Sequence, residues 1–337
     1  MKLYTTAPLE DPREARTLYP QLEAIGYDGA FSFEAKHDPF LPIAVAAEHT
    51  KTLRLGTAVA IAFARNPMNL ANLAWGAQLL SEGRFLLGLG TQVRPHVEHR
   101  FSMPWSKPAA RMREIVLALR AIFAAWQHGE KLDFRGEHYR HTLMIPAFDP
   151  GPNPFGPPPV FVGGFGPRMC EVAGETADGF LAHPFNTRES LTTLVLPALE
   201  RGLAKCERTR RDVEVICATL VVTADDERDF ARSVSAARKH LAFYGSTPAY
   251  RGVLDLHGWG DLQTDLNRMS KEGKWVEMGE LIDDEILGTF AVTGEPEEIA
   301  TQLHERYGDI VDRLSFYAPY QADPERWSKV LAGFKNT

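Results

Sequence analysis

The sequence predicts an α/β fold, namely a (β/α)8 TIM barrel with insertions after strands 4 and 7. Short apolar runs rich in β-branched and aromatic residues alternate seven or eight times with longer segments of helical periodicity. Some of these runs are apolar almost throughout, as is typical of parallel strands covered on both faces. Eight units favour a closed barrel over an open, doubly wound sheet. A simple barrel takes roughly 250 residues. The rest of this 337-residue chain is therefore expected in insertions near 91–109, 131–159 and 244–290 of a single domain, 1–337.

Each predicted strand is a short apolar or aromatic run that ends close to glycine or a polar residue. The third run reads RLGTAVAIAF and is the most continuously apolar of them. In chain order, the strands are expected at Leu3–Ala7, Gly29–Glu34, Arg54–Phe63, Arg84–Gly90, Val160–Gly163, Gly179–His183, Val213–Val222 and Arg313–Tyr317.

Each predicted helix has apolar residues at helical spacing, and two of them carry clear end signals. Gly26 stops the first helix, and Pro67 suits the first position of the third. Leu132–Leu143 is expected as a hairpin, Pro146–Pro159 as a loop, and Gly245–Gly288 as short helical pieces that interrupt the alternation. In chain order, the helices are expected at Glu14–Ile25, Pro42–His49, Pro67–Leu80, Ala110–Gln127, Arg168–Glu175, Arg188–Glu207, Asp226–Phe243 and, as the last, Glu295–Tyr307.

Composition excludes several classes of function. The 37 basic and 44 acidic residues give a net charge of −7, which is no footprint for nucleic acid or an anionic membrane. Three cysteines form no C-x-x-C pair and no disulfide framework. No run approaches the ~20 apolar residues of a membrane span, and the first residues read as a strand rather than as a signal peptide. A cytoplasmic protein with a small-molecule substrate is expected.

In a barrel of this kind the chemistry lies where strands end and the following loops begin. Glu34 ends the second predicted strand and is followed by Ala35, Lys36, His37 and Asp38. Imidazole is the group most easily tuned for proton transfer near neutral pH, so His37 and Glu34 are the candidate catalytic residues. The alternative is that Asp38 caps the next helix and the rest of the segment is solvated.

Glycine-rich turns follow two strands, at Gly88–Gln92 and Gly163–Pro167. Glycine lets a backbone approach a flat ring or a phosphate, and free N–H groups at a helix start suit an anion. Val93 and Met169 stand where a dinucleotide fingerprint needs its third glycine, so that fingerprint fails. Tight turns are the plain alternative.

The segment His183–Thr187 ends the sixth predicted strand and carries an imidazole, an amide and a hydroxyl. Phosphate binding is one interpretation. Capping of the next helix by Asn186 or Thr187 is the other. The pairs His96/His99 and His138/His141 lack further ligands at a standard spacing, so no metal site is expected.

Five segments together resemble the bacterial luciferase-like flavin oxidoreductase superfamily. They are Arg54–Ala60 (RLGTAVA), Arg65–Met68 (RNPM), Ser81–Gly90 (SEGRFLLGLG), Val160–Pro167 (VFVGGFGP) and Ala177–Phe180 (ADGF). The finer pattern resembles the branch that uses the deazaflavin coenzyme F420, on His37–Pro42, Met103–Glu114, Ser246–Arg251 and Leu256–Gly260.

This resemblance implies a non-prolyl cis peptide at Ala58–Val59 behind the coenzyme ring. It further implies that Thr91 and Gln92 flank the ring or side chain and that Gly164, Phe165 and Gly166 meet the phosphate and tail. The same mouth would be lined by His183, Asn186 and Thr187.

The sequence also departs from one pattern of this superfamily. Its sugar-phosphate dehydrogenases carry Asp-His after strand two and a glutamate after strand four, whereas here Glu34–His37 reads EAKH and Thr91–Arg94 reads TQVR. Sugar-phosphate oxidation is therefore in doubt, and His37, then Glu34, is the choice for the acid or base.

Four functions stay open on these grounds. The first is hydride transfer with F420, and the second is an FMN-dependent monooxygenase supplied by a separate flavin reductase. The third is a non-catalytic flavin-binding protein, and the fourth a hydrolase built on Glu34. The anionic tail of F420 needs a cationic exit, which could come from Arg65, Arg94, Arg100, Lys107, Arg111 and Arg168.

The resemblance suggests a homodimer or a larger homo-oligomer. The last insertion is both aromatic and polar, and it is interpreted equally as a lid over a substrate or as a subunit interface. The residues concerned are Tyr244, Tyr250, Arg251, His257 and Trp259.

Overall fold

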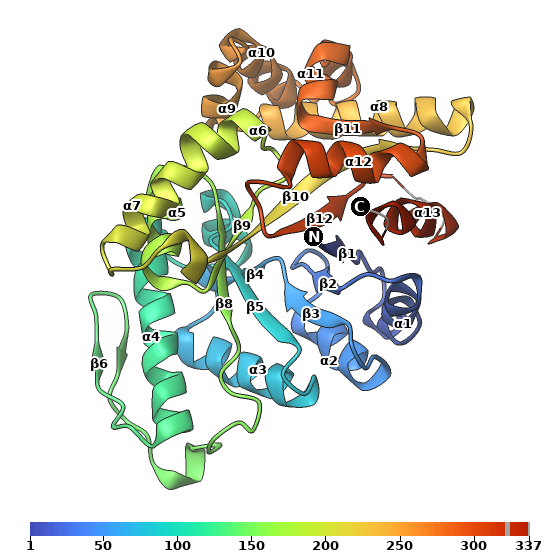
Figure 1. Ribbon diagram of the computed structural model, residues 1–337. Helices are drawn as coiled ribbons and strands as arrows, with labels where there is room; N and C mark the ends of the chain where they lie inside the picture. Colours follow the sequence, from blue (N-terminus) through green and yellow to red (C-terminus); the bar gives the residue numbers. More distant parts are fainter. Residues whose placement is uncertain (321–323, 336–337) are drawn as a thin grey trace.

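The computed structural model describes residues 1–320 and 324–335, which form a closed parallel barrel surrounded by helices (Figure 1). Eight strand positions follow one another in the order β1-β2-β3-β5-β8-β9-β10-β12, and pairing of β12 with β1 closes the barrel. The predicted TIM barrel is confirmed. The barrel sheet consists of β1 (Lys2–Thr6), β2 (Gly29–Ser32), β3 (Arg54–Thr57), β4 (Ala60–Ile61), β5 (Phe85–Gly90), β8 (Val160–Gly164), β9 (Gly179–Ala182), β10 (Glu214–Thr223), β11 (Ala291–Gly294) and β12 (Arg313–Tyr317).

The helices begin and end where local chemistry dictates. Gly26 is left-handed (φ 106°) after the first helix, as its position predicts. Asn66 accepts the amide of Asn69 at 2.9 Å, with Pro67 following it at the first helical position. The helices are α1 (Ala15–Ile25), α2 (Phe40–His49), α3 (Pro67–Leu80), α4 (Pro108–His128), α5 (Pro167–Thr176), α6 (Arg188–Ser190), α7 (Leu196–Ala204), α8 (Glu227–Gly245), α9 (Arg251–Leu256), α10 (Gly260–Lys271), α11 (Asp284–Phe290), α12 (Pro296–Tyr307) and α13 (Pro324–Lys335).

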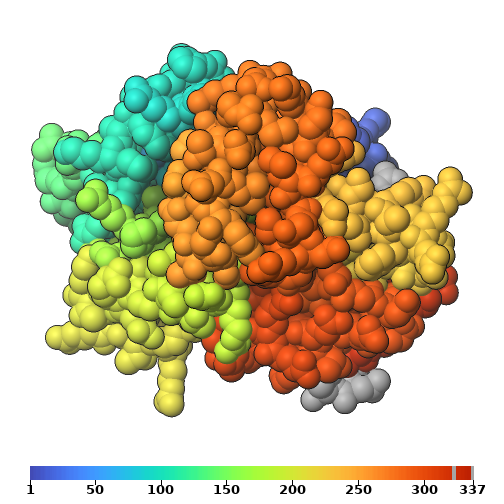
Figure 2. Space-filling view, turned by 90° about the horizontal axis from the view of Figure 1, so that it is seen from above, coloured from blue at the N-terminus to red at the C-terminus, as the bar shows by residue number. Residues whose placement is uncertain are grey.

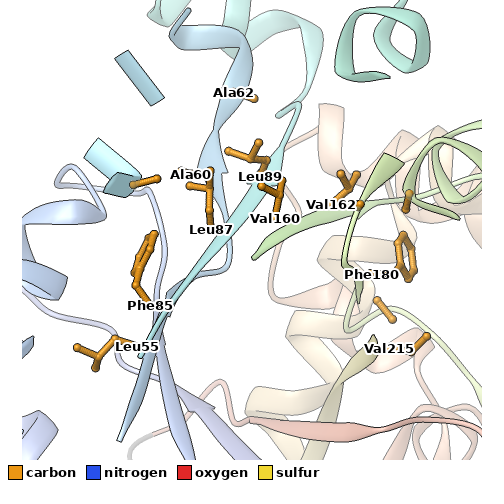
Figure 3. Packing of buried hydrophobic residues seen from close by; sticks show 14 of the residues in the cluster. Leu55, Ala60, Ala62, Phe85, Leu87, Leu89, Val160, Val162, Phe180 and Val215 are labelled. Carbon is orange, nitrogen blue, oxygen red and sulfur yellow. The ribbon is translucent and has the colours of Figure 1, made fainter. Parts of the chain in front are cut away.

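The barrel strands are buried on both faces, which explains their continuous apolar runs. Along β5, Phe85, Leu87 and Leu89 pack outward with the helices, whereas Leu86 points into the barrel. Figure 3 shows the outward layer between strands and helices. The inner cluster consists of Tyr4, Phe31, Leu86, Phe161, Leu181 and Ile216.

The structure differs from the expected elements in four main ways. The expected strand Arg54–Phe63 is divided into β3 and β4 by a cis peptide, and it then turns into the 3₁₀ segment Ala62–Ala64. The helix expected at Arg188–Glu207 contains a π-helical stretch, Leu191–Val195, between α6 and α7. The short strand β11 was not expected. Nor is α12 the last helix, because α13 follows β12.

Three segments stand outside the regular alternation. Residues 91–107 precede α4 and contain the π-helical turn His96–Arg100. The expected hairpin is present as β6 (Phe134–Arg135) and β7 (Arg140–His141). Helices α9 to α11 and the 3₁₀ segment Glu277–Leu281 follow α8. Seen from above, this last segment lies across the centre of the molecule, in orange (Figure 2). Among the described residues, no helix is both long and apolar enough to cross a membrane.

Close packing inside the barrel at Gly88, and open space at Gly76, predict a difference in stability between variants of these two glycines. A Cβ at Gly88 would lie 1.9 Å from the carbonyl oxygen of Thr57, whereas one at Gly76 in α3 would meet nothing within 4 Å. We expect Gly88→Ala to lower the free energy of unfolding by about 1–3 kcal/mol. Gly76→Ala should raise it by about 0.5–1 kcal/mol, because alanine favours a helix. Urea unfolding measures both, and equal effects would contradict the packing argument.

Candidate functional site

A cavity of about 690 Å³ lies at the carboxyl ends of the barrel strands. This volume is in the usual range for small-molecule and cofactor sites. Its floor is mostly apolar, and its upper wall carries hydroxyl and imidazole groups. Its lining includes Glu34, Ala58, Val59, Thr91, Gln92, Arg94, Phe165, His183, Tyr244, Tyr250, Ser315 and Tyr317.

One wall is formed by the Ala58–Val59 peptide, which is cis, as the family resemblance implies. The amide of Ala58 donates to Ser32 O at 2.8 Å, and Glu34 N donates to Val59 O at 3.2 Å. Gly90 lies directly against this wall, since a Cβ there would come within 2.5 Å of the Val59 side chain. A larger residue at that position would displace the wall.

Glu34 lines the cavity but is held in a network. Its Oε2 accepts the amide of Ile61 at 2.7 Å and Arg65 Nη1 at 2.6 Å. The other end of the Arg65 guanidinium donates to Asp38 at 2.6 Å. The side chains of Glu34 and Arg65 are only 7% and 13% exposed. The carboxylate therefore positions the strand-three wall and is already neutralised by an arginine.

His37 is not among the residues that line the cavity, which corrects the expectation that it faces the site. Its side chain is exposed, and Nε2 lies 2.8 Å from the carbonyl oxygen of Glu10. Asp38 Oδ1 accepts the amide of Phe40 at the start of α2, as in the alternative interpretation of this segment. A residue that follows a barrel strand is expected near the mouth of the barrel, but the loop turns the imidazole of His37 outward.

The loop after β5 contributes Thr91 and Gln92 to the cavity. Gln92 has a left-handed backbone (φ 61°). Thr91 Oγ1 donates to Gln92 O at 2.9 Å, and Gln92 Oε1 accepts the amide of Val93 at 2.9 Å. Both side chains are thereby ordered at the rim. The loop after β8 brings Gly164 and Phe165 to the same cavity.

Gly166 lies outside this cavity and lines a second hollow of about 630 Å³ beside it. The two spaces share Pro108, Phe165 and Met169. Helices α4 and α5 both begin here, after Lys107 and Gly166, and neither start has a side-chain cap. Uncapped N–H groups at a helix start attract anions.

Two cationic side chains, Lys107 and Arg168, line this hollow. Lys107 pairs with Glu137 at 2.7 Å, whereas Arg168 forms no ion pair within the described part of the chain. Three other expected exit cations are engaged elsewhere. Arg65 is bound to Glu34, Arg100 donates to Ala35 O, and Arg111 is buried against Tyr139 and Pro104.

His183 lines the cavity at the end of β9. Its Nδ1 accepts the amide of Phe185 at 3.1 Å, and its Nε2 lies 3.1 Å from the Tyr250 hydroxyl. Burial, with a smaller contribution from His240, lowers the pKa of His183 to about 3, so the imidazole is neutral at pH 7.

Asn186 and Thr187 are buried behind the cavity instead of lining it, which corrects their expected place at the mouth. Thr187 Oγ1 accepts the amide of Ser190 at 3.0 Å and caps α6, as the alternative interpretation states. Asn186 Nδ2 donates to His183 O, so it shapes the turn that presents the histidine.

Sequence reasoning missed Tyr317, which lines the cavity, and His240, which contacts it. Tyr317 ends β12, and its hydroxyl lies 2.7 Å from His240 Nε2; Tyr244 donates to Tyr317 at 3.4 Å. Burial lowers the pKa of His240 to about 4. The rule of strand ends would have found Tyr317, because it is the last residue of the predicted eighth strand. His240 carries no such signal.

Across residues 1–320 and 324–335, no group of three or more His, Cys, Asp or Glu side chains is placed to hold a metal ion.

The sequence and the fold of the chain are similar to those of known proteins. The model of the luciferase-like monooxygenase family matches residues 2–313. An uncharacterized protein of Mycobacterium tuberculosis is 55% identical over 293 residues, covering 87% of this chain and 86% of its own. A 5,10-methylenetetrahydromethanopterin reductase of Archaeoglobus fulgidus is 27% identical, covering 78% of this chain and 76% of its own.

Among solved structures, the coenzyme F420-dependent tetrahydromethanopterin reductase of Methanopyrus kandleri is similar with a TM-score of 0.81. Its identity is 19%, and the match covers 98% of this chain and 96% of that one. At this identity the likeness shows the fold.

The buried imidazoles predict a pH dependence of stability. The pKa of His183 is about 3 in the folded protein and ~6.5 when unfolded. The unfolded chain therefore binds more protons in this window, and stability falls as the pH drops from ~6.5 towards 3. We expect His183→Gln to reduce the slope of unfolding free energy between pH 6.5 and 5 by up to ~1.4 kcal/mol per pH unit. The same substitution at exposed His128 is the control, and an unchanged slope in the His183 variant would refute the account.

The Glu34 network predicts a difference in stability between variants of two glutamates, Glu34 and Glu10. Glu34→Gln leaves the largely buried Arg65 without the more buried of its two carboxylate partners, so the free energy of unfolding should fall by about 1–3 kcal/mol. Glu10→Gln removes the exposed pair with Lys36 and should have no measurable effect. Chemical denaturation compares the two, and a Glu34 variant as stable as the wild type would mean that this carboxylate is free for chemistry.

Proposed function

The chain belongs to the luciferase-like monooxygenase family, and from this premise we propose that it transfers a hydride between coenzyme F420 and a small organic substrate at the mouth of the barrel. Its relatives support the general class, a flavin- or deazaflavin-dependent oxidoreductase. The choice of F420 and the place of reaction are the parts that we propose.

The residues present fit a flat, anionic coenzyme. The cavity is large enough for such a coenzyme. Ala58 and Val59 form one apolar wall, and Gly90 has no side chain that would displace it. Among the described residues, Glu34 is the one carboxylate on the lining, and it is already paired with Arg65. An aromatic ring can therefore be buried without facing an uncompensated charge.

The observation that carries the proposal is the second hollow. It adjoins the cavity, receives the uncapped starts of α4 and α5, and contains the cations Lys107 and Arg168. FMN ends at one phosphate, whereas F420 continues into an acidic lactyl-oligoglutamate tail. A separate cationic space of about 630 Å³ is more than one phosphate requires.

Each part of the coenzyme then has its own residues. Ala58, Val59, Thr91 and Gln92 would hold the ring and side chain. Gly164, Phe165 and Gly166, with Lys107 and Arg168, would hold the phosphate and tail. The bound deazaflavin supplies a carbon that gives or accepts a hydride. The protein orients the reactants, excludes water beneath the segment after α8, and manages one proton.

An FMN-dependent monooxygenase is the second candidate, and the name of the family favours it. Such an enzyme would need reduced flavin from a partner reductase. A flavin-binding protein without activity is less well supported, because the cavity presents ordered hydrogen-bonding groups opposite its apolar floor.

Binding measurements distinguish these functions. Fluorescence-quench titrations of the purified protein with F420 and with FMN should give micromolar or tighter binding for F420 and weaker binding for FMN. Arg168→Ala should weaken F420 binding about tenfold by removing a charge-assisted contact to the tail. Arg201→Ala, at an exposed arginine of α7 paired with Glu171, is the matched control. A preference for FMN that is indifferent to Arg168 would transfer the protein to the monooxygenase function.

A further inference from the structure

One hydroxyl of the cavity has a free hydrogen, and the hydrogen bonds around it show why. The amide of Phe185 donates to Nδ1 of His183, so Nδ1 carries no proton. Because this imidazole is neutral, its single hydrogen is on Nε2, 3.1 Å from the Tyr250 hydroxyl. His183 is therefore the donor and the Tyr250 oxygen the acceptor. No other described residue forms a hydrogen bond with that hydroxyl.

The Tyr250 ring is held by its neighbours as well as by this bond. Its centroid lies 4.5 Å from that of Phe165 and 4.6 Å from that of His183, and it stacks on Phe185 at 5.8 Å and 27°. Three residues from the loops after β8 and β9 thus hold a side chain that comes from the segment after α8. Such packing reduces the entropy lost when the hydroxyl binds a ligand.

The other tyrosines of the cavity are differently engaged. Tyr244 donates to Tyr317, and Tyr317 in turn contacts Nε2 of His240. Tyr317 has two hydrogen-bonding partners within the protein, whereas Tyr250 has only one and uses its oxygen as the acceptor. Among the three tyrosines of the described lining, Tyr250 is therefore the donor that a ligand can meet without breaking an existing bond.

Fixed charge on the described lining is compensated. Glu34 is bound by Arg65, and Arg94 lies 2.9 Å from Glu98 in an exposed ion pair. The groups around Tyr250 are neutral hydroxyls and imidazoles. A phosphate or carboxylate substrate finds no uncompensated cation there, whereas an uncharged molecule with a polar oxygen finds a free donor.

We infer that Tyr250 is the catalytic proton donor to the carbonyl oxygen of an uncharged substrate and that His183 is its positioning residue. The inference rests on the proposed function for its hydride source, reduced F420. The carbonyl carbon gains the hydride, the π electron pair of the C=O bond moves to oxygen, and that oxygen takes the Tyr250 proton. Solvent water then returns a proton to the tyrosine. In the oxidation of an alcohol the same atoms run in reverse.

This assignment moves the acid or base away from the loop after strand two. His37, the sequence-based choice, has its imidazole on the surface next to Glu10, and Glu34 is held by Arg65. Burial raises the pKa of Tyr250 to about 12, so its hydroxyl keeps the proton until a substrate oxygen accumulates charge.

The test uses acetophenone labelled with ¹³C at its carbonyl as an uncharged probe. Its ¹³C chemical shift is measured when bound to the full-length protein, both with F420 added and without it. A hydrogen bond to the carbonyl moves this resonance downfield. We expect a downfield shift in the wild type, its loss in Tyr250→Phe, and a three- to tenfold weaker probe affinity in that variant. Tyr244→Phe removes a hydroxyl from the same wall and should keep the shift.

The positioning role has its own pair of variants. His183→Leu removes the N–H donor and should reduce the downfield shift, whereas His183→Gln offers both an acceptor for Phe185 N and a donor for Tyr250 and should restore it. A shift lost equally in both variants would leave His183 a structural role only.

The outcomes separate this inference from the proposed function. Absence of F420 binding alone defeats the proposed function, and the probe still reports on Tyr250 in the coenzyme-free protein. F420 binding together with a probe shift that survives Tyr250→Phe, or disappears in Tyr244→Phe, overturns the inference and leaves the coenzyme assignment standing. Failure of the probe to bind wild-type protein overturns the substrate class.

Discussion

The site depends on the buried contacts that the carboxylate of Glu34 makes. It accepts the amide of Ile61 and the guanidinium of Arg65, and so it joins the end of β2 to the chain beyond β3. The Ala58–Val59 wall lies between these attachment points. Because both partners are largely buried, this bond is exchanged little with water and holds the wall in one place. It acts together with the backbone bonds from Ala58 N to Ser32 O and from Glu34 N to Val59 O, which hold the same wall.

Neutral and cationic groups occupy different places around this wall. The interior of the cavity presents apolar groups and neutral hydroxyls and imidazoles, whereas unsatisfied positive potential gathers next door, where α4 and α5 begin near Arg168. Burial itself maintains the neutrality, since it lowers the pKa of both His183 and His240. A hydride is transferred best where water is excluded, and an anionic tail is bound best beside uncapped helix starts and cationic side chains.

Periodicity and glycine placement predict the barrel because each strand is buried on both faces, so that its apolar run is continuous. The family resemblance added the cis peptide, which no propensity predicts. Side-chain direction was beyond reach: His37 follows a strand end yet turns outward, and Thr187 uses its hydroxyl to cap α6. The strand β11 follows directly on α11, within a stretch that breaks the regular alternation, so its four residues were not separated from that stretch in the sequence. Tyr250 was noticed as part of a lid or an interface, and only the fold brings it to His183.

The segment after α8 is better described as a wall than as a loose cover. It builds a second apolar core with the outer end of β10, in which Phe290 stacks on Phe185 at 4.5 Å. His257 reaches down to Thr187 at 2.9 Å, so the cap of α6 and the segment stabilise each other. The barrel thus provides the Ala58–Val59 wall, and a separately packed segment provides the Tyr250 hydroxyl. Because different stretches of chain supply these two surfaces, a change in the segment alters the substrate side while the wall keeps its shape.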